Sequence, residues 1–452
     1  MKFDLSWELE EVLDEIERNG GRIFFVGGYV RDYLMEESWP SNDIDLEIFC
    51  FDLDRLKVVL EKFGVVSQVG RAYGILKLDI FPEVDFALAR QEIKIGKSHQ
   101  EFEIKLLDEF DIEKAARRRD FTINAIYVEY KTGSIHDPYS GQKDLRDRTL
   151  RMVSQETFKE DPLRVLRLAQ FMARFNFKPD QKTREECRKL VAANELEYLS
   201  NERIFHEYDK MLLGPYPGSG ISFLREINGL LKPLQDQETT MQRLDYHPEG
   251  NVLNHTIMVV ELASLVKQKT SNPSYFMWAN FLHDIGKPEV TTSDLHAPYH
   301  AQVGVEVFDQ QLSDLIKNKE MAKYLKVMIR YHMSLMNMAR KSNQDYNYLR
   351  LLKDIEPAVS LDELFLLTKC DKLGRKKEGY LDYKLVTKFV SEMTAKHGKK
   401  ALEPYLRGRD LVEWGIPDPK RYGRILDEAY DLQLKGMARD KIIDIVRGKY
   451  GK

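Results

Sequence analysis

The spacing of hydrophobic and polar residues divides the chain into two parts. In the first ~150 residues, helical periodicity is mixed with short apolar runs of strand length. The runs predict strands at Arg22–Val26, Ile44–Phe49, Gly74–Leu78 and Glu83–Leu88. We therefore expect an α+β domain built around a small sheet.

From Pro162 onward the apolar residues recur almost entirely at helical spacing, which predicts an all-α remainder. Proline and glycine cluster in GPYPGSG at 214–220, which indicates a loop. The polar stretch QRLDYHPEGN at 242–251 precedes histidine-rich helices. Residues 404–424 predict two short helices around a proline turn, in a C-terminal tail.

Composition narrows the protein class. The chain has 452 residues and is 43% hydrophobic, yet it has no apolar run near the ~20 residues that span a bilayer. Its acidic start predicts an amphipathic helix closed by glycine and not a signal peptide. The three cysteines lie far apart without CxxC spacing. We therefore expect a cytoplasmic protein without disulfides and without a membrane partner.

Charge is distributed unevenly along the chain. The net charge is −4, but residues 111–190 carry 18 Lys and Arg against 13 Asp and Glu. Residues 1–60 carry 6 against 15. A nearly neutral protein can therefore present a local basic face to phosphates, although a charge run is more often solvated surface.

Two aspartates alternate with apolar residues in NDIDLEIF. On a strand, Asp43 and Asp45 share one face while Ile44 and Leu46 face the other side. Two carboxylates on one side of a rigid strand suit a pair of Mg²⁺ ions. Such a pair activates an attacking hydroxyl and stabilises the leaving oxygen in phosphoryl transfer.

A pair of glycines precedes these aspartates by about 15 residues. Gly27 and Gly28 lie at a predicted strand-to-helix turn, where backbone N–H groups can approach a phosphate closely. Arg31 follows one helical turn later on the same side. Each motif is common alone, but their order and spacing together predict a nucleotide and metal site.

Two further clusters suggest nucleotide contacts. Arg118 and Arg119 can hold triphosphate oxygens, and Asp120 can accept a hydrogen bond from a ribose hydroxyl. Asp161 and Arg164 are spaced i,i+3 and can read a base edge with one acceptor and one donor. A surface arginine cluster and an ordinary helix salt bridge are the competing interpretations.

The motifs resemble the class II tRNA nucleotidyltransferases, or CCA-adding enzymes, whose head is similar to that of bacterial poly(A) polymerases. The matching segments occur in the family's order and cover most of residues 20–210: GGYVRD, DID, RRDFTINAI, HDPYSGQKDL, EDPLRVLR and ERIFHE. The resemblance implies a polymerase-β-like head with Asp43 and Asp45 as ligands of catalytic Mg²⁺. It also implies nucleotide contacts from Gly28, Arg31, Arg119, Asp120, Asp161, Arg164 and Arg167, with the helix of Asp161 braced by Glu202, Arg203 and Glu207.

One position departs from the family pattern, and another is a candidate to complete the metal site. The family often carries an arginine three residues after Arg167, where this chain has Gln170. Asp85, in VDFALAR on a predicted neighbouring strand, is our candidate for a third metal-binding carboxylate. VGRAYGILKL at 69–78 is closer to the CCA-adding pattern than to the poly(A) polymerase pattern.

The helical part carries a second set of possible metal ligands. These residues are His255, His283, Asp284, His300, His332 and Asp371. Imidazole and carboxylate together suit Mn, Ni, Zn or Fe better than Mg. The order resembles the HD-domain phosphohydrolases, which implies His255, His283, Asp284 and Asp371 as core ligands. His300 and His332 then serve a second metal or a phosphate, and Lys287 meets a substrate phosphate.

The resemblances imply a division into four parts: a nucleotidyltransferase head at 1–155, an all-α neck at 156–240, an HD domain at 241–390 and a tail at 391–452. The function they imply is addition of CMP and AMP from CTP and ATP to tRNA 3′ ends. The HD domain implies a phosphatase or 2′,3′-cyclic phosphodiesterase acting on RNA ends.

Three alternatives stay open on the sequence. One is an A-adding enzyme or poly(A) polymerase. Another is a nucleotide phosphohydrolase with an inert head, and the third is a non-catalytic RNA-binding protein. The intact aspartates speak against the last two, and the sequence does not indicate an oligomeric state.

Overall fold

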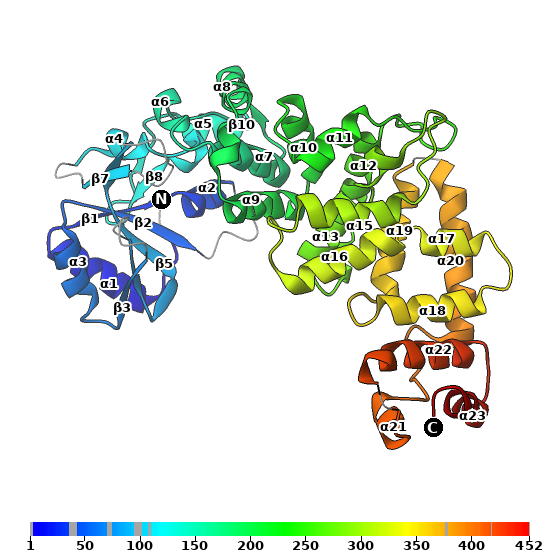
Figure 1. The fold of residues 1–452 in the computed structure, drawn as a ribbon. Helices are drawn as coiled ribbons and strands as arrows, with labels where there is room; N and C mark the ends of the chain where they lie inside the picture. Colours follow the sequence, from blue (N-terminus) through cyan, green and yellow to red (C-terminus); the bar gives the residue numbers. More distant parts are fainter. Residues whose placement is uncertain are drawn as a thin grey trace. The chain divides into compact units, whose positions relative to one another are not determined.

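The computed structural model describes residues 3–35, 43–69, 75–94, 102–106, 110–375, 378–416 and 418–451. The chain forms two compact units, Met1–Gly229 and Leu230–Lys452. The first contains a sheet and the second is helical, which confirms the predicted order of an α+β part followed by helices (Figure 1). The finer boundaries at 155, 240 and 390 stay predictions.

A seven-stranded mixed sheet organises the first unit. Its strand order is β3-β4-β5-β2-β1-β8-β9, and β2 runs parallel to β5 while the other pairs are antiparallel. The strands are β1 (Arg22–Val26), β2 (Ile44–Phe49), β3 (Val66–Val69), β4 (Ile75–Leu78), β5 (Phe81–Leu88), β8 (Tyr127–Glu129) and β9 (Ile135–His136). β6 (Arg90–Lys94) and β7 (Phe102–Leu106) form a separate hairpin, and β10 (Thr149–Leu150) pairs with β11 (Lys178–Pro179). The four predicted strands are confirmed where the structure describes them; Gly74 lies outside the described residues.

The two faces of this sheet have different partners. Alternate residues of β1, β2 and β5, such as Phe25, Leu46 and Phe86, pack in one apolar core with α1 (Trp7–Arg18) and α3 (Leu53–Leu60). The other face carries a smaller apolar cluster that includes Phe24 and Tyr127, and also bears the polar residues of β2. The period of two along a strand therefore separates the core from the polar face.

The remaining helices of the first unit include α7 and its two partners. α7 contacts α9 and α10 extensively. The helices are α2 (Gly28–Leu34), α4 (Ile112–Ala116), α5 (Gly141–Arg146), α6 (Gln155–Phe158), α7 (Leu163–Phe175), α8 (Gln181–Ala192), α9 (Asn201–Leu213) and α10 (Pro217–Glu226). Short 3₁₀ turns lie at Thr122–Asn124 and Glu195–Tyr198.

The loop prediction for 214–220 is wrong over its second half. α10 begins at Pro217, and 217–220 form its first turn. Proline is well suited to the first helical position because its missing N–H has no helical partner there. Gly220 lets α10 approach α7 closely, since a Cβ at Gly220 would lie 2.5 Å from the carbonyl oxygen of Ala169.

The second unit is built around α13, which is buried almost throughout from Phe276 to Leu282. An apolar helix of this kind is covered on all sides by others, and α12, α16 and α19 contact it. The helices are α11 (Lys232–Thr239), α12 (Val252–Ser264), α13 (Pro273–Leu282), α14 (Lys287–Val290), α15 (His300–Gln311), α16 (Lys319–Tyr331), α17 (Ser334–Ala339), α18 (Asp345–Ile355), α19 (Leu361–Leu373) and α20 (Glu378–His397). None of the helices in the described ranges has both the length and the apolarity to cross a membrane.

The last helices have an apolar core of their own. α21 (Gly408–Glu413), α22 (Tyr422–Leu434) and α23 (Arg439–Tyr450) enclose buried residues such as Leu411 and Ile442. Arg350 and Lys353 of α18 pair with Asp427 of α22 and join this core to the rest of the unit. The first short helix expected in 404–424 is confirmed as α21, whereas the second begins only at the end of that segment and continues to Leu434; position 417 lies outside the described residues.

Candidate active sites

Three aspartates lie near one end of the paired strands β2 and β5. Asp45 lies opposite Asp85 in the parallel register, and Asp43 directly precedes β2. Ile44 and Leu46 lie in the apolar core, so the predicted alternation along β2 is confirmed. Asp85 Oδ1 lies 2.9 Å from Lys77 Nζ of the adjacent strand.

The electrostatics of Asp45 suit a bound cation. Burial raises the pKa of Asp45, and the nearby charges of Asp85 and Asp43 raise it further, whereas Arg119 acts in the opposite direction. Like charges held this close disfavour ionisation unless a counter-ion is present. Carboxylate oxygens are the ligands that Mg²⁺ prefers, but the oxygens of the three aspartates do not all lie within 4.8 Å of one another, so a shared ion would require these side chains to move closer together.

The diglycine turn lies directly beside this carboxylate group. Gly27 has a φ of +74°, and a Cβ there would lie 2.6 Å from Asp45 Oδ2 and 3.4 Å from Arg119 Nη1. Only glycine combines that backbone conformation with such a close approach. The backbone of Gly28 also hydrogen-bonds the Asp45 carboxylate. The turn thus brings backbone N–H groups, a carboxylate and an arginine together.

Arg31, which we expected to contact a phosphate, is instead bound to other side chains of the protein in this structure. Its guanidinium is only 3% exposed, donates to Asp32 Oδ1 over 2.7 Å and to Asn124 Oδ1 over 2.7 Å, and lies over the Phe175 ring. In this structure Arg31 therefore joins α2 to the 3₁₀ turn at Thr122–Asn124. The sequence reasoning missed both of its polar partners.

Glu47 accepts hydrogen bonds from Arg118 and Arg119, the two arginines predicted to bind phosphate. Its Oε2 accepts from Arg119 Nη2 at 2.9 Å, Arg118 Nη2 at 3.1 Å and the Tyr127 hydroxyl at 3.2 Å. Burial opposes its charge, but Arg118 and Arg119 keep its pKa below the ordinary value. Sequence reasoning missed Glu47, although it continues the alternation of Asp43 and Asp45 by one more step.

Buried Asp120 pairs with the partly exposed Arg167 at the start of the helical region. Asp120 Oδ2 accepts from Arg167 Nε at 2.8 Å, and Asp120 Oδ1 accepts from Asn124 Nδ2 at 2.9 Å. Burial alone would raise the pKa of Asp120, but Arg167 and Asn124 lower it to about 2. Glu207 Oε1 lies 3.7 Å from Arg167 Nη1, so Arg167 lies between two carboxylates.

Asp161 and Arg164 flank the first turn of α7. Asp161 Oδ2 accepts from Arg203 Nη2 at 2.8 Å, whereas Arg164 donates to the carbonyl oxygens of Thr157 and Arg118. These contacts fix both side chains to different parts of the unit. Glu202, the third predicted brace, is 85% exposed in its side chain and lies 4.0 Å from His206 of its own helix.

The second unit brings the six predicted metal ligands together from five helices or their ends. Their ligand atoms form two groups, each within 4.8 Å: one of His255, His283 and Asp371, and one of Asp284, His300 and His332. His255, His283, Asp284, His332 and Asp371 are all buried. The structure therefore places in one cluster all the residues that the sequence singled out.

Asp284 lies between the two groups. Its Oδ2 is 3.1 Å from His283 Nε2, and its Oδ1 is 3.4 Å from His300 Nε2 and 3.5 Å from His332 Nε2. A carboxylate facing two sets of imidazoles in this way can serve a metal on either side.

The histidine protons can be assigned from backbone contacts. The Nδ1 atoms of His300 and His332 lie 2.8 Å and 2.7 Å from the carbonyl oxygens of Ala297 and Ile329. A carbonyl oxygen only accepts, so both Nδ1 atoms carry the proton. The two Nε2 atoms face each other 3.2 Å apart. Burial lowers the pKa of His300 to about 4, which keeps the ring neutral, and a transition metal is the partner that such nitrogens fit.

Sequence reasoning missed two residues behind His255. Glu249 Oε1 lies 2.8 Å from His255 Nδ1 and 2.9 Å from His247 Nδ1. A carboxylate on the far nitrogen of a metal-binding histidine fixes its orientation and its tautomer. Both residues occur in the HPEG segment, whose closeness to His255 in the sequence was the available signal.

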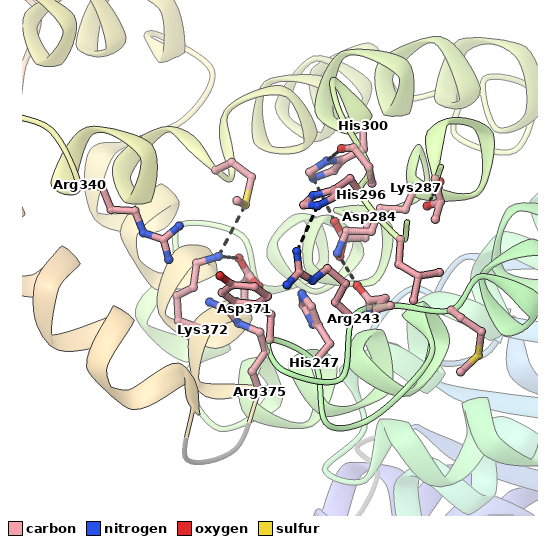
Figure 2. A pocket seen from close by; sticks show the side chains of 17 residues that line it. Arg243, His247, Asp284, Lys287, His296, His300, Arg340, Asp371, Lys372 and Arg375 are labelled. Carbon is pink, nitrogen blue, oxygen red and sulfur yellow. Dashed lines mark hydrogen bonds and ion pairs between the residues drawn. The ribbon is translucent and has the colours of Figure 1, made fainter. Parts of the chain in front are cut away.

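A cavity of about 320 Å³ opens onto these ligands, which is at the small end of the usual range for ligand pockets. Figure 2 shows Asp284, His300 and Lys287 on one side of it and Lys372, Arg375 and Arg340 on the other. Lys287 Nζ lies 2.6 Å from Asp284 Oδ2, and Lys372 Nζ lies 2.7 Å from Asp371 Oδ2. The pocket thus combines metal-binding residues with cations that suit a phosphate.

Family models match three parts of the chain. The Poly A polymerase head domain matches residues 23–151, the probable RNA and SrmB-binding site of polymerase A matches 176–238, and the HD domain matches 252–376. The chain is also similar in fold to solved CCA-adding enzymes. The Bacillus stearothermophilus enzyme in complex with CTP has a TM-score of 0.66 at 17% identity, covering 98% of this chain and 99% of that one. The Thermotoga maritima enzyme complexed with tRNA has a TM-score of 0.59 at 18% identity, covering 98% and 96%.

Curated relatives share more of the sequence. A multifunctional CCA protein of Haemophilus ducreyi is 31% identical over 384 residues, covering 83% of this chain and 90% of its own length. One from Actinobacillus pleuropneumoniae is 34% identical over 327 residues, covering 70% and 77%. With 83% of the chain covered, the first of these matches extends over both units. The chain therefore belongs to the family of multifunctional CCA proteins, as the resemblance of its motifs predicted.

Proposed function

We propose that the protein adds CMP and AMP from CTP and ATP to the 3′ ends of tRNA. The observation that carries this proposal is the placement of Asp45, which pairs with Asp85 of the neighbouring strand, beside the turn of Gly27 and Gly28. The tRNA 3′-hydroxyl attacks the α-phosphorus, a new P–O bond forms, the α–β bond breaks and pyrophosphate leaves. The family relationship supports this reaction.

The aspartates are the residues that would hold magnesium. When bound there, Mg²⁺ lowers the pKa of the attacking hydroxyl and neutralises charge on the leaving pyrophosphate. Arg119 and Arg118, anchored by Glu47, orient the triphosphate beside the glycine turn. Their fixed positions let them stabilise negative charge without reorganising during the reaction.

Asp161 and Arg164 select the incoming base in this proposal. Arg203 fixes the carboxylate of Asp161, while Arg167 is positioned by Asp120 and Glu207. A carboxylate accepts from the amino group of cytosine or adenine, and a guanidinium donates to the adjacent ring atom. Rigidly held donors and acceptors can discriminate bases without a nucleic-acid template.

Incorporation of labelled nucleotide tests the transferase. Asp45→Asn should reduce incorporation into tRNA lacking its CCA end by more than about 100-fold, because a metal ligand is lost. Asp54→Asn, at an exposed position of α3, is the matched control and should retain activity. Full activity in Asp45→Asn would refute the assignment.

The same assay separates CCA addition from its close alternatives. With CTP alone, a CCA-adding enzyme extends a tRNA that lacks all three terminal nucleotides, whereas an A-adding enzyme or poly(A) polymerase gives no product. With ATP alone on that substrate, a CCA-adding enzyme should give little product.

We further propose that the HD site hydrolyses phosphate esters at RNA ends, including 2′,3′-cyclic phosphates. His255, His283, Asp284 and Asp371, with His300 and His332, would hold one or two ions of Mn, Ni, Zn or Fe. Such an ion, when bound, activates water and polarises the phosphoryl group. Lys287 lies where it can orient a phosphate at Asp284.

The proposed hydrolysis would supply the substrate of the transferase. The oxygen of water bonds to phosphorus, one ring P–O bond breaks, and the proton passes to the leaving ribose oxygen. Hydrolysis of the resulting monoester releases phosphate and leaves a free 3′-hydroxyl, which the transferase site can extend.

A metal and activity assay tests the HD proposal. Asp284→Asn should abolish hydrolysis of a nucleoside 2′,3′-cyclic phosphate and lower the content of bound transition metal. The control Asp314→Asn changes an exposed aspartate outside the pocket and should affect neither. Unaltered hydrolysis and metal content in Asp284→Asn would refute the assignment.

We also propose a reducing compartment such as the cytoplasm, which the free thiols of Cys50, Cys187 and Cys370 support.

A further inference from the structure

The HD pocket carries more positive charge than one reacting phosphate requires. Five of its lining side chains are Lys or Arg, and two are carboxylates. The carboxylates, Asp284 and Asp371, are paired with Lys287 and Lys372. The arginines of the lining are paired instead with carboxylates outside it, Arg243 with Asp245 and both Arg340 and Arg375 with Asp382.

Two of these arginines share one carboxylate. Arg340 Nη2 lies 3.0 Å from Asp382 Oδ1, and Arg375 Nη2 lies 2.8 Å from Asp382 Oδ2. Arg375 is 7% exposed, and its Nε has no hydrogen-bond partner within the ranges that the structure describes. Lys372, 2% exposed, is a second buried cation of the same pocket. Lys372 is balanced by Asp371, but Arg340 and Arg375 share a single carboxylate and together keep a net positive charge, which favours binding of an anion.

This arginine pair is separated from the inner phosphate position. In Figure 2, Arg340 lies on the opposite side of the pocket from Lys287 and Asp284. The Arg340 side chain is half exposed, so this side of the pocket reaches solvent. An anion held by Arg340 and Arg375 is therefore a different group from the phosphate at Asp284. Guanidinium groups recognise phosphate through paired N–H donors, which suits this position.

The pocket also has a surface on which a base can lie. Tyr246 lines it, is 49% exposed and lies with its ring 5.1 Å from the Arg243 guanidinium. Met241 and Leu295 are further exposed apolar residues of the lining. Aromatic side chains stack on any base. A nucleotide between the two phosphate positions therefore finds a partner for its base.

We propose that Arg340 and Arg375 form a second phosphate subsite, which binds the phosphodiester on the 5′ side of the terminal nucleotide and selects the 3′ end of an RNA chain over a mononucleotide. This inference rests on the proposed HD hydrolase. A nucleotide that reacts at its 2′,3′-phosphate carries its next phosphate on the 5′ side, and a cyclic mononucleoside phosphate lacks that group. The subsite thus distinguishes the 3′ end of an RNA chain from a cyclic mononucleoside phosphate by the charge of the additional phosphate.

Steady-state kinetics with paired substrates tests the subsite. One substrate is a dinucleotide ending in a 2′,3′-cyclic phosphate, and the other is the corresponding nucleoside 2′,3′-cyclic phosphate. The wild-type protein should have the higher kcat/KM for the dinucleotide. Arg340→Gln and Arg375→Gln should each reduce that preference by about tenfold, the value of one charge-assisted contact, mainly through KM.

Two further variants separate binding from structural support. Asp382→Asn breaks the same ion pairs but leaves both guanidinium groups charged, so the dinucleotide preference should persist. If Arg340, Arg375 and Asp382 only support the structure, Arg340→Gln, Arg375→Gln and Asp382→Asn should all lose the preference equally. That result would overturn the subsite. Arg407→Gln, at an exposed pair with Glu403 in the tail, is the matched control and should retain the wild-type preference.

The remaining outcomes also decide the question. A third substrate, the cyclic mononucleotide with a 5′-phosphate monoester, separates selection of charge from selection of a chain. Faster cleavage of this compound than of the dinucleotide would overturn the assignment to RNA ends. Equal preference in wild type and both arginine variants would overturn the subsite and leave the hydrolase standing. Failure of the wild type to cleave any of the substrates would overturn both.

Discussion

Glu47 and Glu249 hold other site residues in place, one in each unit. Glu47 fixes Arg118 and Arg119, and Glu249 fixes His255. Both keep a pKa below the ordinary value despite burial: Arg118 and Arg119 cause this for Glu47, and hydrogen bonds with His247 and His255 lower that of Glu249 to about 2. They are positioning residues, because they act through the side chains that they bind.

Neutralising Glu249 should weaken metal binding in the HD site. Glu249→Gln removes the charge behind His255 but keeps the shape of the side chain. Loss of such a partner typically costs about 10-fold to 100-fold in metal affinity. Titration with Mn²⁺ or Ni²⁺, followed by calorimetry, measures the change. Glu306→Gln, exposed on α15, is the control, and equal affinities in the two variants would contradict this role.

Sequence reasoning found the chemically reactive residues more readily than their supports. Asp43, Asp45 and the histidines stand in recognisable local spacing. Glu47 meets Arg119 across 72 positions of sequence, and Arg31 meets Asn124 across 93, so these pairs depend on the tertiary fold. Glu202 shows the opposite error, since motif similarity predicted a brace where the side chain faces solvent.

The crossing of α7 and α10 depends on Gly220. Any Cβ there would meet the carbonyl oxygen of Ala169 at 2.5 Å and Met211 Sδ at 2.8 Å. Gly220→Ala should therefore lower the free energy of unfolding of the first unit by about 1–3 kcal/mol through overpacking.

Gly448→Ala provides the comparison for Gly220→Ala. Gly448 lies in α23, and a Cβ at this position would have no neighbouring atom within 4 Å. Alanine there should be neutral or stabilise by up to about 1 kcal/mol, because it is the better helix former. Thermal and urea unfolding of both variants measure the difference, and equal stability would show that α10 adjusts without cost.

The pair of Asp120 and Arg167 joins the loop before β8 to α7 and makes stability depend on pH. Since the pKa of Asp120 falls from 3.8 to about 2 on folding, its contribution is present above about pH 4 and is lost as pH falls towards 2. Asp120→Asn should cost on the order of 2 kcal/mol near pH 7, and this difference should shrink on acidification through that window. Urea unfolding at pH 7 and pH 3 measures it; a difference independent of pH would contradict the linkage.

Strands and long helices were predictable because each has a regular period of apolar residues. β2 and β5 follow a period of two, β1 is a short continuous apolar run, and α13 is apolar on all sides. The start of α10 was not predictable from composition, since proline and glycine favour a loop locally while packing against α7 favours a helix. Tertiary contacts decided that segment.

Each site lies wholly within one compact unit. The aspartates, the arginines and the residues proposed to select the base belong to Met1–Gly229, and the histidine cluster with its pocket belongs to Leu230–Lys452. The two chemistries therefore need no shared side chain. Their coupling is chemical, because one proposed reaction yields the hydroxyl that the other consumes.

This separation predicts that the two activities can be lost independently. Asp45→Asn should lower nucleotide addition more than about 100-fold and keep cyclic phosphodiesterase activity within about twofold, and Asp284→Asn should do the reverse. On tRNA ending in a 2′,3′-cyclic phosphate, only a mixture of both variants should restore CCA addition. Loss of both activities in either single variant would refute the separation.

The alternation along β2 limits how this gene segment can vary. Ile44, Leu46 and Ile48 fill the apolar core, whereas Asp45 and Glu47 lie on the other face, where Phe49 joins the smaller apolar cluster. Deleting or inserting a single codon between Ile44 and Phe49 would exchange the two faces, placing carboxylates in the hydrocarbon interior and isoleucines on the face of the proposed site. The strand can therefore accept many substitutions, whereas its length is fixed.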